Sequence, residues 1–201
     1  IGVLEKISVI DVGGGFGVPY NVDEKEFNVN IFFKEFDKLL RRYVNSTCEI
    51  WVEVGRYLVA DSGIFVSTVQ DIKEVDESHI ILIIDGGMNN FLRPALLKVR
   101  HPALILNKLD CYASSVTASI CGPLCTPLDC LIENEEVPRT TTVGDIVGIF
   151  KVGAYGFSLS PLFFTLQKIP RELVIYKGNI KETTSRRISD SYDLLRYLYK
   201  F

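Results

Sequence analysis

A run of three glycines directly after an apolar segment is the feature that most constrains the fold of this chain. Residues 11–20 read DVGGGFGVPY, so that Gly13, Gly14 and Gly15 follow the apolar residues 7–10. Consecutive glycines lose much conformational entropy on folding, and they are expected where the backbone turns tightly or is approached closely. A Gly-rich turn between a strand and a helix often presents bare N–H groups to a phosphate. A tight turn and a phosphate cradle are equally good interpretations of the glycines alone.

The residues on both sides of the glycines predict a βαβ unit. Residues 5–12 have the pattern of a buried strand, residues 29–44 that of an amphipathic helix, and residues 48–54 that of a second apolar strand. The apolar side chains at helical spacing are those of Ile31, Phe32, Phe36, Leu39, Leu40 and Tyr43. Strand, turn, helix and strand in this order imply parallel strands.

The pattern changes after about residue 62. Short β-rich runs separated by turn residues follow at 64–72, 79–85, 103–108, 115–120, 145–152 and 172–177. This all-β pattern favours a sandwich or a barrel, and residues 188–200 predict a terminal helix. We therefore expect an α/β part over residues 1–62 and a β domain with a terminal helix over residues 63–201.

The composition is that of an ordinary globular protein. Of the 201 residues, 47% are hydrophobic and 23% are charged, and the formal net charge is -3. This negative net charge gives no positive field that would attract a nucleic acid. No apolar run approaches the roughly 20 residues of a membrane span, so we expect no membrane partner.

The five cysteines do not suggest a disulfide framework. Their number is odd and the chain is not small, so a reducing cytoplasm fits these cysteines better than an oxidising compartment does. Cys121, Cys125 and Cys130 lie close in sequence, but their spacing is not that of a zinc site and both histidines are far away. We therefore predict no metal.

A charged pair follows the second predicted strand. Glu53 and Arg56 stand three residues apart in the run VEVGR, and buried charges are costly unless they are paired or used. In (β/α)8 barrels the phosphate site often lies after the last two strands, which would suit a glycine turn followed by an arginine. The alternative is a salt bridge between Glu53 and Arg56.

Five segments in a fixed order carry a family resemblance: DVGGGFGVPY, WVEVGRYLVADSG, DGGMNNFLRPAL, GPLCTPLDCL and VGDIVGIFKVGAYG, within residues 11–156. Together they resemble the pyridoxal-phosphate-dependent decarboxylases of the alanine-racemase-like fold, which include diaminopimelate and ornithine decarboxylases. The resemblance implies the C-terminal portion of a (β/α)8 barrel followed by a sandwich- or barrel-like β domain. It also implies amino-acid decarboxylation with pyridoxal 5'-phosphate as the cofactor.

The resemblance assigns one group of residues to the cofactor: Gly13, Gly14, Gly15, Glu53, Gly55, Arg56 and Tyr155. The glycine amides and Arg56 would bind the phosphate. Glu53 would face the pyridine nitrogen and favour its protonated form, which makes the ring an electron sink. Tyr155 would reach back to the cofactor; the alternative is an ordinary core aromatic beside a strand end.

A second group would serve the substrate. By resemblance, Cys125 is catalytic and returns a proton to the α-carbon in the site of the neighbouring subunit. Sites shared in this way imply a homodimer. Arg93, Thr126 and Asp129 would contact the substrate. For Cys125 alone, a buried structural cysteine is the competing interpretation.

Two departures from the family pattern concern the substrate. Thr126 stands where diaminopimelate decarboxylases usually carry Glu, and Leu97 stands where Tyr is usual. A site without these groups would leave a charged distal head poorly paired. The sequence resembles more closely the subgroup with the glutamyl-carrier-protein decarboxylase of butirosin biosynthesis, and we expect a carrier-tethered or otherwise modified amino acid.

A third departure concerns the Schiff-base lysine. The family carries this lysine in a motif early in the barrel, and no lysine of this chain matches it. We expect the chain to act as part of a longer chain or complex, with the N-terminal half of the barrel as its partner. The alternative is a non-catalytic regulatory or binding homologue on the same scaffold.

Overall fold

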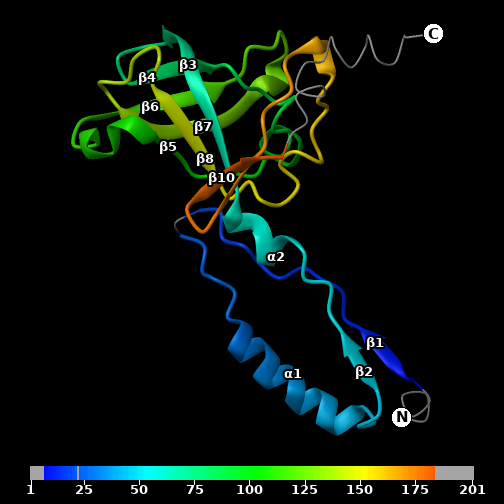
Figure 1. Ribbon diagram of the computed structural model, residues 1–201. Helices are drawn as coiled ribbons and strands as arrows, with labels where there is room; N and C mark the ends of the chain where they lie inside the picture. Colours follow the sequence, from blue (N-terminus) through cyan, green and yellow to red (C-terminus); the bar gives the residue numbers. More distant parts are fainter. Residues whose placement is uncertain (1–6, 22, 184–201) are drawn as a thin grey trace, which may run out of the picture.

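A computed structural model of the chain describes residues 7–21 and 23–183. The terminal helix predicted at residues 188–200 lies outside the described residues. Figure 1 shows a slender N-terminal unit that extends away from a compact β domain, with the short helix α2 (Arg56–Val59) between them.

The N-terminal unit is the predicted βαβ arrangement. Strand β1 (Val9–Asp11) pairs in parallel with β2 (Glu49–Trp51), and helix α1 (Val29–Tyr43) connects them. The helix begins at its cap Asn28, whose side-chain oxygen accepts a hydrogen bond of 2.9 Å from the backbone N–H of Ile31. The prediction of parallel strands on both sides of a helix is confirmed.

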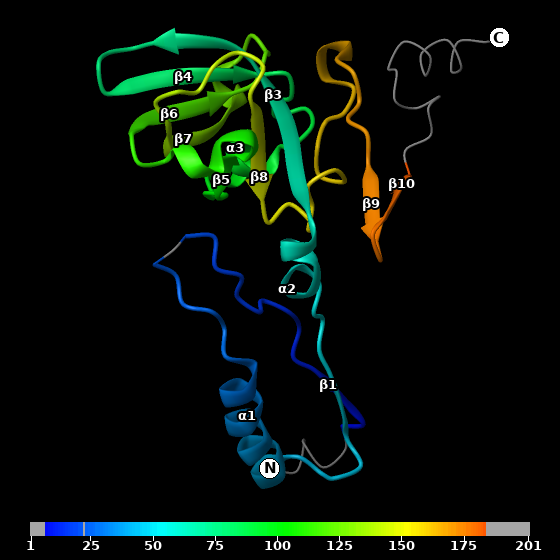
Figure 2. The ribbon, with the colours of Figure 1, turned by 60° about the vertical axis from the view of Figure 1, so that its left-hand side comes forward.

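The expected burial of this unit is wrong for the chain as described. Neither strand contains a buried residue, and α1 has none either. The large apolar side chains that the unit leaves exposed include Val9, Ile31, Leu39, Tyr43 and Trp51. The apolar pattern is real, but no second layer of the described residues covers these faces (Figure 2).

The β domain is built on one six-stranded sheet in the order β5-β8-β3-β4-β6-β7. Its strands in chain order are β3 (Ile64–Glu74), β4 (His79–Ile84), β5 (Ala103–Ile105), β6 (Ser115–Cys121), β7 (Cys130–Pro138) and β8 (Ile146–Phe150). The long strand β3 pairs with β8 from Ile64 to Thr68 and with β4 from Val69 on, with an irregularity between Val69 and Asp71. The two edge strands β5 and β7 approach each other, so the sheet is nearly closed. Of the two predicted architectures, the barrel-like one is confirmed.

The core of the domain lies inside this curved sheet. Strand β6 alternates between buried and partly exposed residues along its whole length, which is the period of a strand with one buried face. Its inward residues meet those of β4 and β8, and the largest apolar side chains of this core are Leu82, Ile84, Phe91, Ile105, Ile120 and Ile149. Phe91 precedes the short helix α3 (Arg93–Leu97), whose first three residues are buried.

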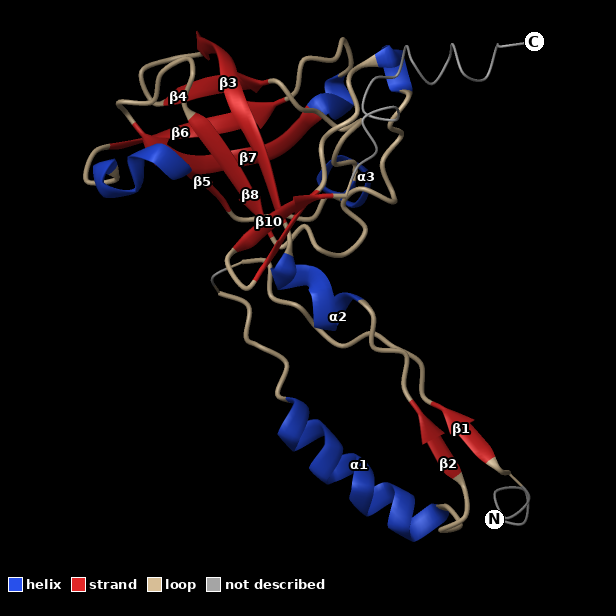
Figure 3. Cartoon of the chain, in the orientation of Figure 1, coloured by secondary structure: helices blue, strands red, loops and turns tan. Residues whose placement is uncertain are grey.

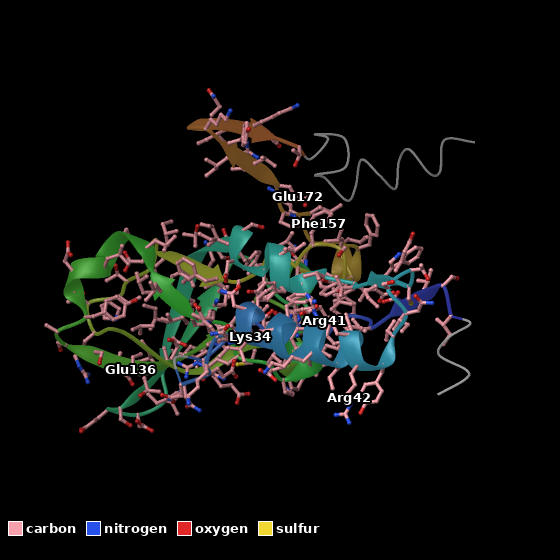
Figure 4. The ribbon with its side chains drawn as sticks, turned by 90° about the horizontal axis from the view of Figure 1, so that it is seen from below. Lys34, Arg41, Arg42, Glu136, Phe157 and Glu172 are labelled. Atoms are coloured by element: carbon pink, nitrogen blue, oxygen red, sulfur yellow. The ribbon has the colours of Figure 1, made fainter. Side chains whose placement is uncertain are left out.

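A hairpin stands apart from the sheet. Strands β9 (Leu173–Tyr176) and β10 (Asn179–Glu182) pair through a two-residue turn, Lys177-Gly178, in which both residues have positive φ. Figure 4 shows this hairpin projecting from the body of the molecule, and Figure 3 shows the loops that connect it to β8. In the described part of the chain, no helix combines the length and the apolarity needed to cross a membrane.

Candidate functional site

The glycine turn is fastened to the end of the neighbouring strand. Gly13 and Gly15 have φ values of +72° and +84°, which L side chains rarely adopt. The N–H of Gly13 donates to the Asp11 carboxylate at 2.8 Å, and the carbonyl of Gly13 accepts a hydrogen bond from the N–H of Glu53 at 2.9 Å. The turn after β1 is therefore held directly against the segment after β2.

Gly14 meets a different constraint. Its φ is not positive, but a Cβ atom at this position would lie 2.6 Å from the backbone oxygen of Glu53. Gly13 and Gly15 thus allow the backbone to turn, whereas Gly14 allows the backbones of the glycine turn and of Glu53 to approach each other closely. The interpretation of the glycines as a tight turn is confirmed, and their role as a phosphate cradle stays a prediction.

A pocket of about 540 Å³ opens beside this turn. Its walls come from the ends of both parallel strands, from the start of α2 and from the turn after β8: Gly14, Gly15, Phe16, Glu53, Val54, Gly55, Arg56, Tyr57 and Tyr155. Every residue that the resemblance assigns to the cofactor, except Gly13, lines it. Tyr155 is half exposed with a φ of +60°, so it is not a core aromatic. The structure brings these residues together, and their binding role stays a prediction.

Glu53 and Arg56 do not pair with each other. Among the residues described, neither side chain has an oppositely charged partner within 4.0 Å. The alternative of a mutual salt bridge is therefore wrong for this structure. The guanidinium of Arg56 instead lies 5.6 Å from the centre of the Tyr20 ring, a distance at which a cation is attracted to an aromatic face.

Arg93 contacts the ring of Tyr20 as well, but it does not line the pocket. Only 7% of Arg93 is exposed, and its guanidinium carbon is 5.3 Å from the centre of the Tyr20 ring. The ring of Tyr20 also meets that of His101 at 4.6 Å. The observed contact of Arg93 is with Tyr20, and its role toward the substrate stays a prediction.

His101 is fully buried between Tyr20 and Phe91. Burial lowers the pKa of His101 from 6.5 to about 4; the bond of its Nδ1 to the carbonyl of Phe150 opposes this shift, and the charge of Arg93 adds to it. Sequence reasoning missed Tyr20 and His101. Tyr20 could have been suspected, because it closes the segment DVGGGFGVPY, whereas nothing in the sequence pointed to His101.

Asp129 holds two loops of the β domain together. It is 2% exposed, and its two carboxylate oxygens accept the backbone N–H groups of Met88 at 2.6 Å and Leu124 at 2.7 Å. Burial raises the pKa of Asp129, while these two hydrogen bonds lower it. The observed contacts of Asp129 are with backbone, and its role toward the substrate stays a prediction.

The loop that Asp129 holds carries Cys125 and Thr126. Cys125 is exposed and does not line the pocket of its own chain, so the interpretation as a buried structural cysteine is wrong. The hydroxyl oxygen of Thr126 accepts the N–H of Leu128 at 3.3 Å. Cys121 and Cys130 face each other across β6 and β7, and the described residues contain no group of three or more side chains that could hold a metal.

Comparison with known proteins gives a consistent result. The family model described as pyridoxal-dependent decarboxylase, C-terminal sheet domain, matches residues 9–153. The chain is 34% identical over 194 residues to a diaminopimelate decarboxylase of Buchnera aphidicola subsp. Baizongia pistaciae, covering 90% of this chain and 46% of that protein. It is 34% identical over 175 residues to the Bacillus subtilis diaminopimelate decarboxylase, covering 85% and 39%.

The fold also matches solved structures. The crystal structure of diaminopimelate decarboxylase from Helicobacter pylori, complexed with L-lysine, superimposes with a TM-score of 0.80 at 28% identity, over 94% of this chain and 44% of that one. The chain thus spans less than half the length of each of these relatives.

Proposed function

This chain belongs to the pyridoxal-dependent decarboxylase family, and we propose that it forms the phosphate-binding wall of the cofactor site in an amino-acid decarboxylase. One observation carries the proposal. A single pocket brings together a glycine turn, an unpaired guanidinium and an unpaired carboxylate from the ends of two parallel strands. This set fits an anionic phosphate attached to a heteroaromatic ring.

The residues present fit the phosphate of pyridoxal 5'-phosphate. Gly14 and Gly15 line the pocket without side chains, so a ligand can approach the backbone there. The guanidinium of Arg56 has no carboxylate partner in the described chain and can form charge-assisted hydrogen bonds to phosphate oxygens. We propose that the glycine amides orient the phosphate and that Arg56 supplies most of the charge.

The remaining roles concern protons. When bound, pyridoxal phosphate supplies an electron sink for the electron pair that remains after CO2 departs. Glu53, which has no cationic partner within the described residues, would accept a hydrogen bond from the ring nitrogen and keep its proton there. Tyr155 would close the side of the pocket that faces the β domain. Cys125 would hold a proton for the α-carbon in the site of a second subunit, for which its exposure is suitable.

The proposal includes partners. The uncovered apolar faces of β1, β2 and α1 support packing against further strands and helices of a (β/α)8 barrel, since a two-stranded parallel sheet is not stable by itself. We propose that this barrel half brings the Schiff-base lysine and that the complete protein is a cytoplasmic homodimer with shared sites.

The substrate class follows from the loop around Thr126. The relatives are named for diaminopimelate, but neutral Thr126 and Leu97 offer no charge to a distal amino-acid head. The hydroxyl oxygen of Thr126 accepts a hydrogen bond from the N–H of Leu128, and the O–H group that is left to donate is neutral. We therefore propose a carrier-tethered or otherwise modified amino acid, with free diaminopimelate as the second candidate.

The test is CO2 release by the intact protein, together with any chain that co-purifies with it. Diaminopimelate, ornithine and glutamate bound to its carrier protein are supplied separately with pyridoxal phosphate. Release from the carrier-bound substrate alone supports the proposal in full, and efficient turnover of diaminopimelate overturns the substrate class. Cofactor binding with no CO2 from any of the three would favour the non-catalytic homologue.

A further inference from the structure

The ring of Tyr20 lies in contact with two arginines that come from different parts of the chain. Arg56 begins α2 beside the pocket, and Arg93 begins α3 in the β domain. Their guanidinium carbons lie 5.6 Å and 5.3 Å from the centre of the Tyr20 ring. Because Tyr20 is only 6% exposed, the ring is a fixed part of the junction between the two parts of the molecule.

The ring compensates charge that no carboxylate neutralises. In the described residues, neither Arg56 nor Arg93 has an acidic partner within 4.0 Å. Arg93 is 7% exposed, and among the described residues its buried Nε has no hydrogen-bond partner. A buried N–H without an acceptor is costly, and the negative face of an aromatic ring is the compensation that this site offers to the guanidinium.

The ring of His101 also packs against Tyr20, and because it is neutral it adds no charge to those of Arg56 and Arg93. Its Nδ1 lies 2.9 Å from the carbonyl oxygen of Phe150, and because a carbonyl can only accept, Nδ1 carries the proton. The unpartnered Nε2 is then an acceptor. A neutral His101, packed edge-on against Tyr20 at 4.6 Å, therefore acts as a rigid support that is anchored to β8.

The backbone of Tyr20 is fixed as well. Its N–H donates to one carboxylate oxygen of Glu24 at 2.6 Å, and the side-chain amide of Asn21 donates to the other at 2.7 Å. The ring and main chain of Tyr20 are thus both held before any ligand binds.

We propose that Tyr20 is a positioning residue that holds the guanidinium of Arg56 at the pocket and connects it to the β domain through Arg93 and His101. The inference rests on the proposed function, because it assigns Arg56 to the cofactor phosphate. The ring, rather than the hydroxyl, carries this role, since no residue in the described ranges 7–21 and 23–183 forms a hydrogen bond with the hydroxyl of Tyr20.

Three variants of the intact protein, with any chain that co-purifies with it, test the proposal. Tyr20→Leu removes the ring, Tyr20→Phe removes only the hydroxyl, and Tyr176→Leu is the matched control. Tyr176 is exposed on β9 and does not line the pocket, and Nζ of Lys177 lies 5.2 Å from the centre of its ring, so the control loses the same kind of contact.

The first readout is the NMR signal of the arginine Nε–H groups, recorded without cofactor. The Tyr20 ring current shifts the signals of Arg56 and Arg93, and we expect both to move toward unperturbed values in Tyr20→Leu but not in Tyr20→Phe or Tyr176→Leu. The second readout is equilibrium binding of pyridoxal phosphate and of pyridoxal. Tyr20→Leu should weaken pyridoxal phosphate about tenfold and leave pyridoxal within about twofold.

The outcomes separate this proposal from the proposed function. If the unaltered protein binds no pyridoxal phosphate, the proposed function fails, and the arginine signals alone decide whether Tyr20 positions Arg56. Unmoved arginine signals in Tyr20→Leu overturn the positioning role. A loss in Tyr20→Phe as large as in Tyr20→Leu, or an equal loss for pyridoxal, overturns it too, because the hydroxyl or the general packing would then be responsible.

Discussion

Gly14 has no Cβ atom, and a Cβ atom at this position would lie only 2.6 Å from the backbone oxygen of Glu53. The pocket depends on this single approach, because it brings the end of β1 against the end of β2. The place of Gly14, Glu53, Arg56 and Tyr155 at one pocket could be predicted from the sequence, since each belongs to a short segment with a recognisable pattern. Tyr20 could have been suspected, because it closes one of these segments, but its contacts with Arg93 and His101 could not, because those residues lie far away in the chain.

Gly14→Ala should therefore damage both the turn and the pocket. The added methyl group forces one backbone away from the other, and overpacking of this kind costs about 1–3 kcal/mol. We expect a lower melting temperature and weaker pyridoxal phosphate binding. Gly17→Ala is the control, since a Cβ there would lie 3.7 Å from Phe27 at ordinary contact. Equal effects of the two variants would contradict the account.

His101 makes stability depend on pH in a definite direction. Burial lowers its pKa from 6.5 to about 4, so between these values the unfolded chain binds a proton that the folded chain does not. Its contribution to stability is complete above pH 6.5 and is lost as the pH falls toward 4. The loss amounts to about 3 kcal/mol over this range. Denaturant titrations of His101→Gln should show a flatter dependence over this interval, and an unchanged slope would disprove the assignment.

At the scale of elements, the sequence identified those with a clear period and missed those without one. Helix α1 and strand β6 were expected within one or two residues, because apolar side chains recur at 3.6 and 2 positions. Strand β7 was missed, since Glu133, Glu135 and Glu136 interrupt its apolar pattern. Strand β10, with exposed residues along most of its length, gave no pattern at all.

The loop that carries Cys125 is held in place by the side chain of Asp129. Asp129 accepts two backbone N–H groups, one from the segment after β4 and one from the segment after β6.

Asp129→Asn should destabilise this arrangement. An amide group offers one acceptor oxygen, so one buried N–H loses its partner, which costs about 1–3 kcal/mol. Chemical denaturation measures the loss, and Asp110→Asn, at an exposed site, provides the control. Faster alkylation of Cys125 in Asp129→Asn alone would show that the loop has loosened. If the two variants were equally stable, Asp129 would not hold the loops.

At the scale of the molecule, the two parts differ in how completely they are packed. The β domain has a closed core, and its barrel-like class was among the predicted architectures. The N-terminal unit exposes apolar residues on α1, β1 and β2, although its sequence predicts burial. A pattern of apolar residues indicates that a face becomes covered, but it does not state which segment covers it. This is why the topology was predictable and the burial was not.

The central claim is that the pocket between these parts binds a cofactor through its phosphate. The most direct measurement compares the dissociation constants of pyridoxal phosphate and pyridoxal for the intact protein and for Arg56→Gln. We predict that the intact protein prefers pyridoxal phosphate by at least tenfold and that Arg56→Gln loses most of this preference, because charge-assisted hydrogen bonds contribute about 1.5–3 kcal/mol. Equal affinities of the intact protein for both compounds, or an unchanged preference in Arg56→Gln, would contradict the claim.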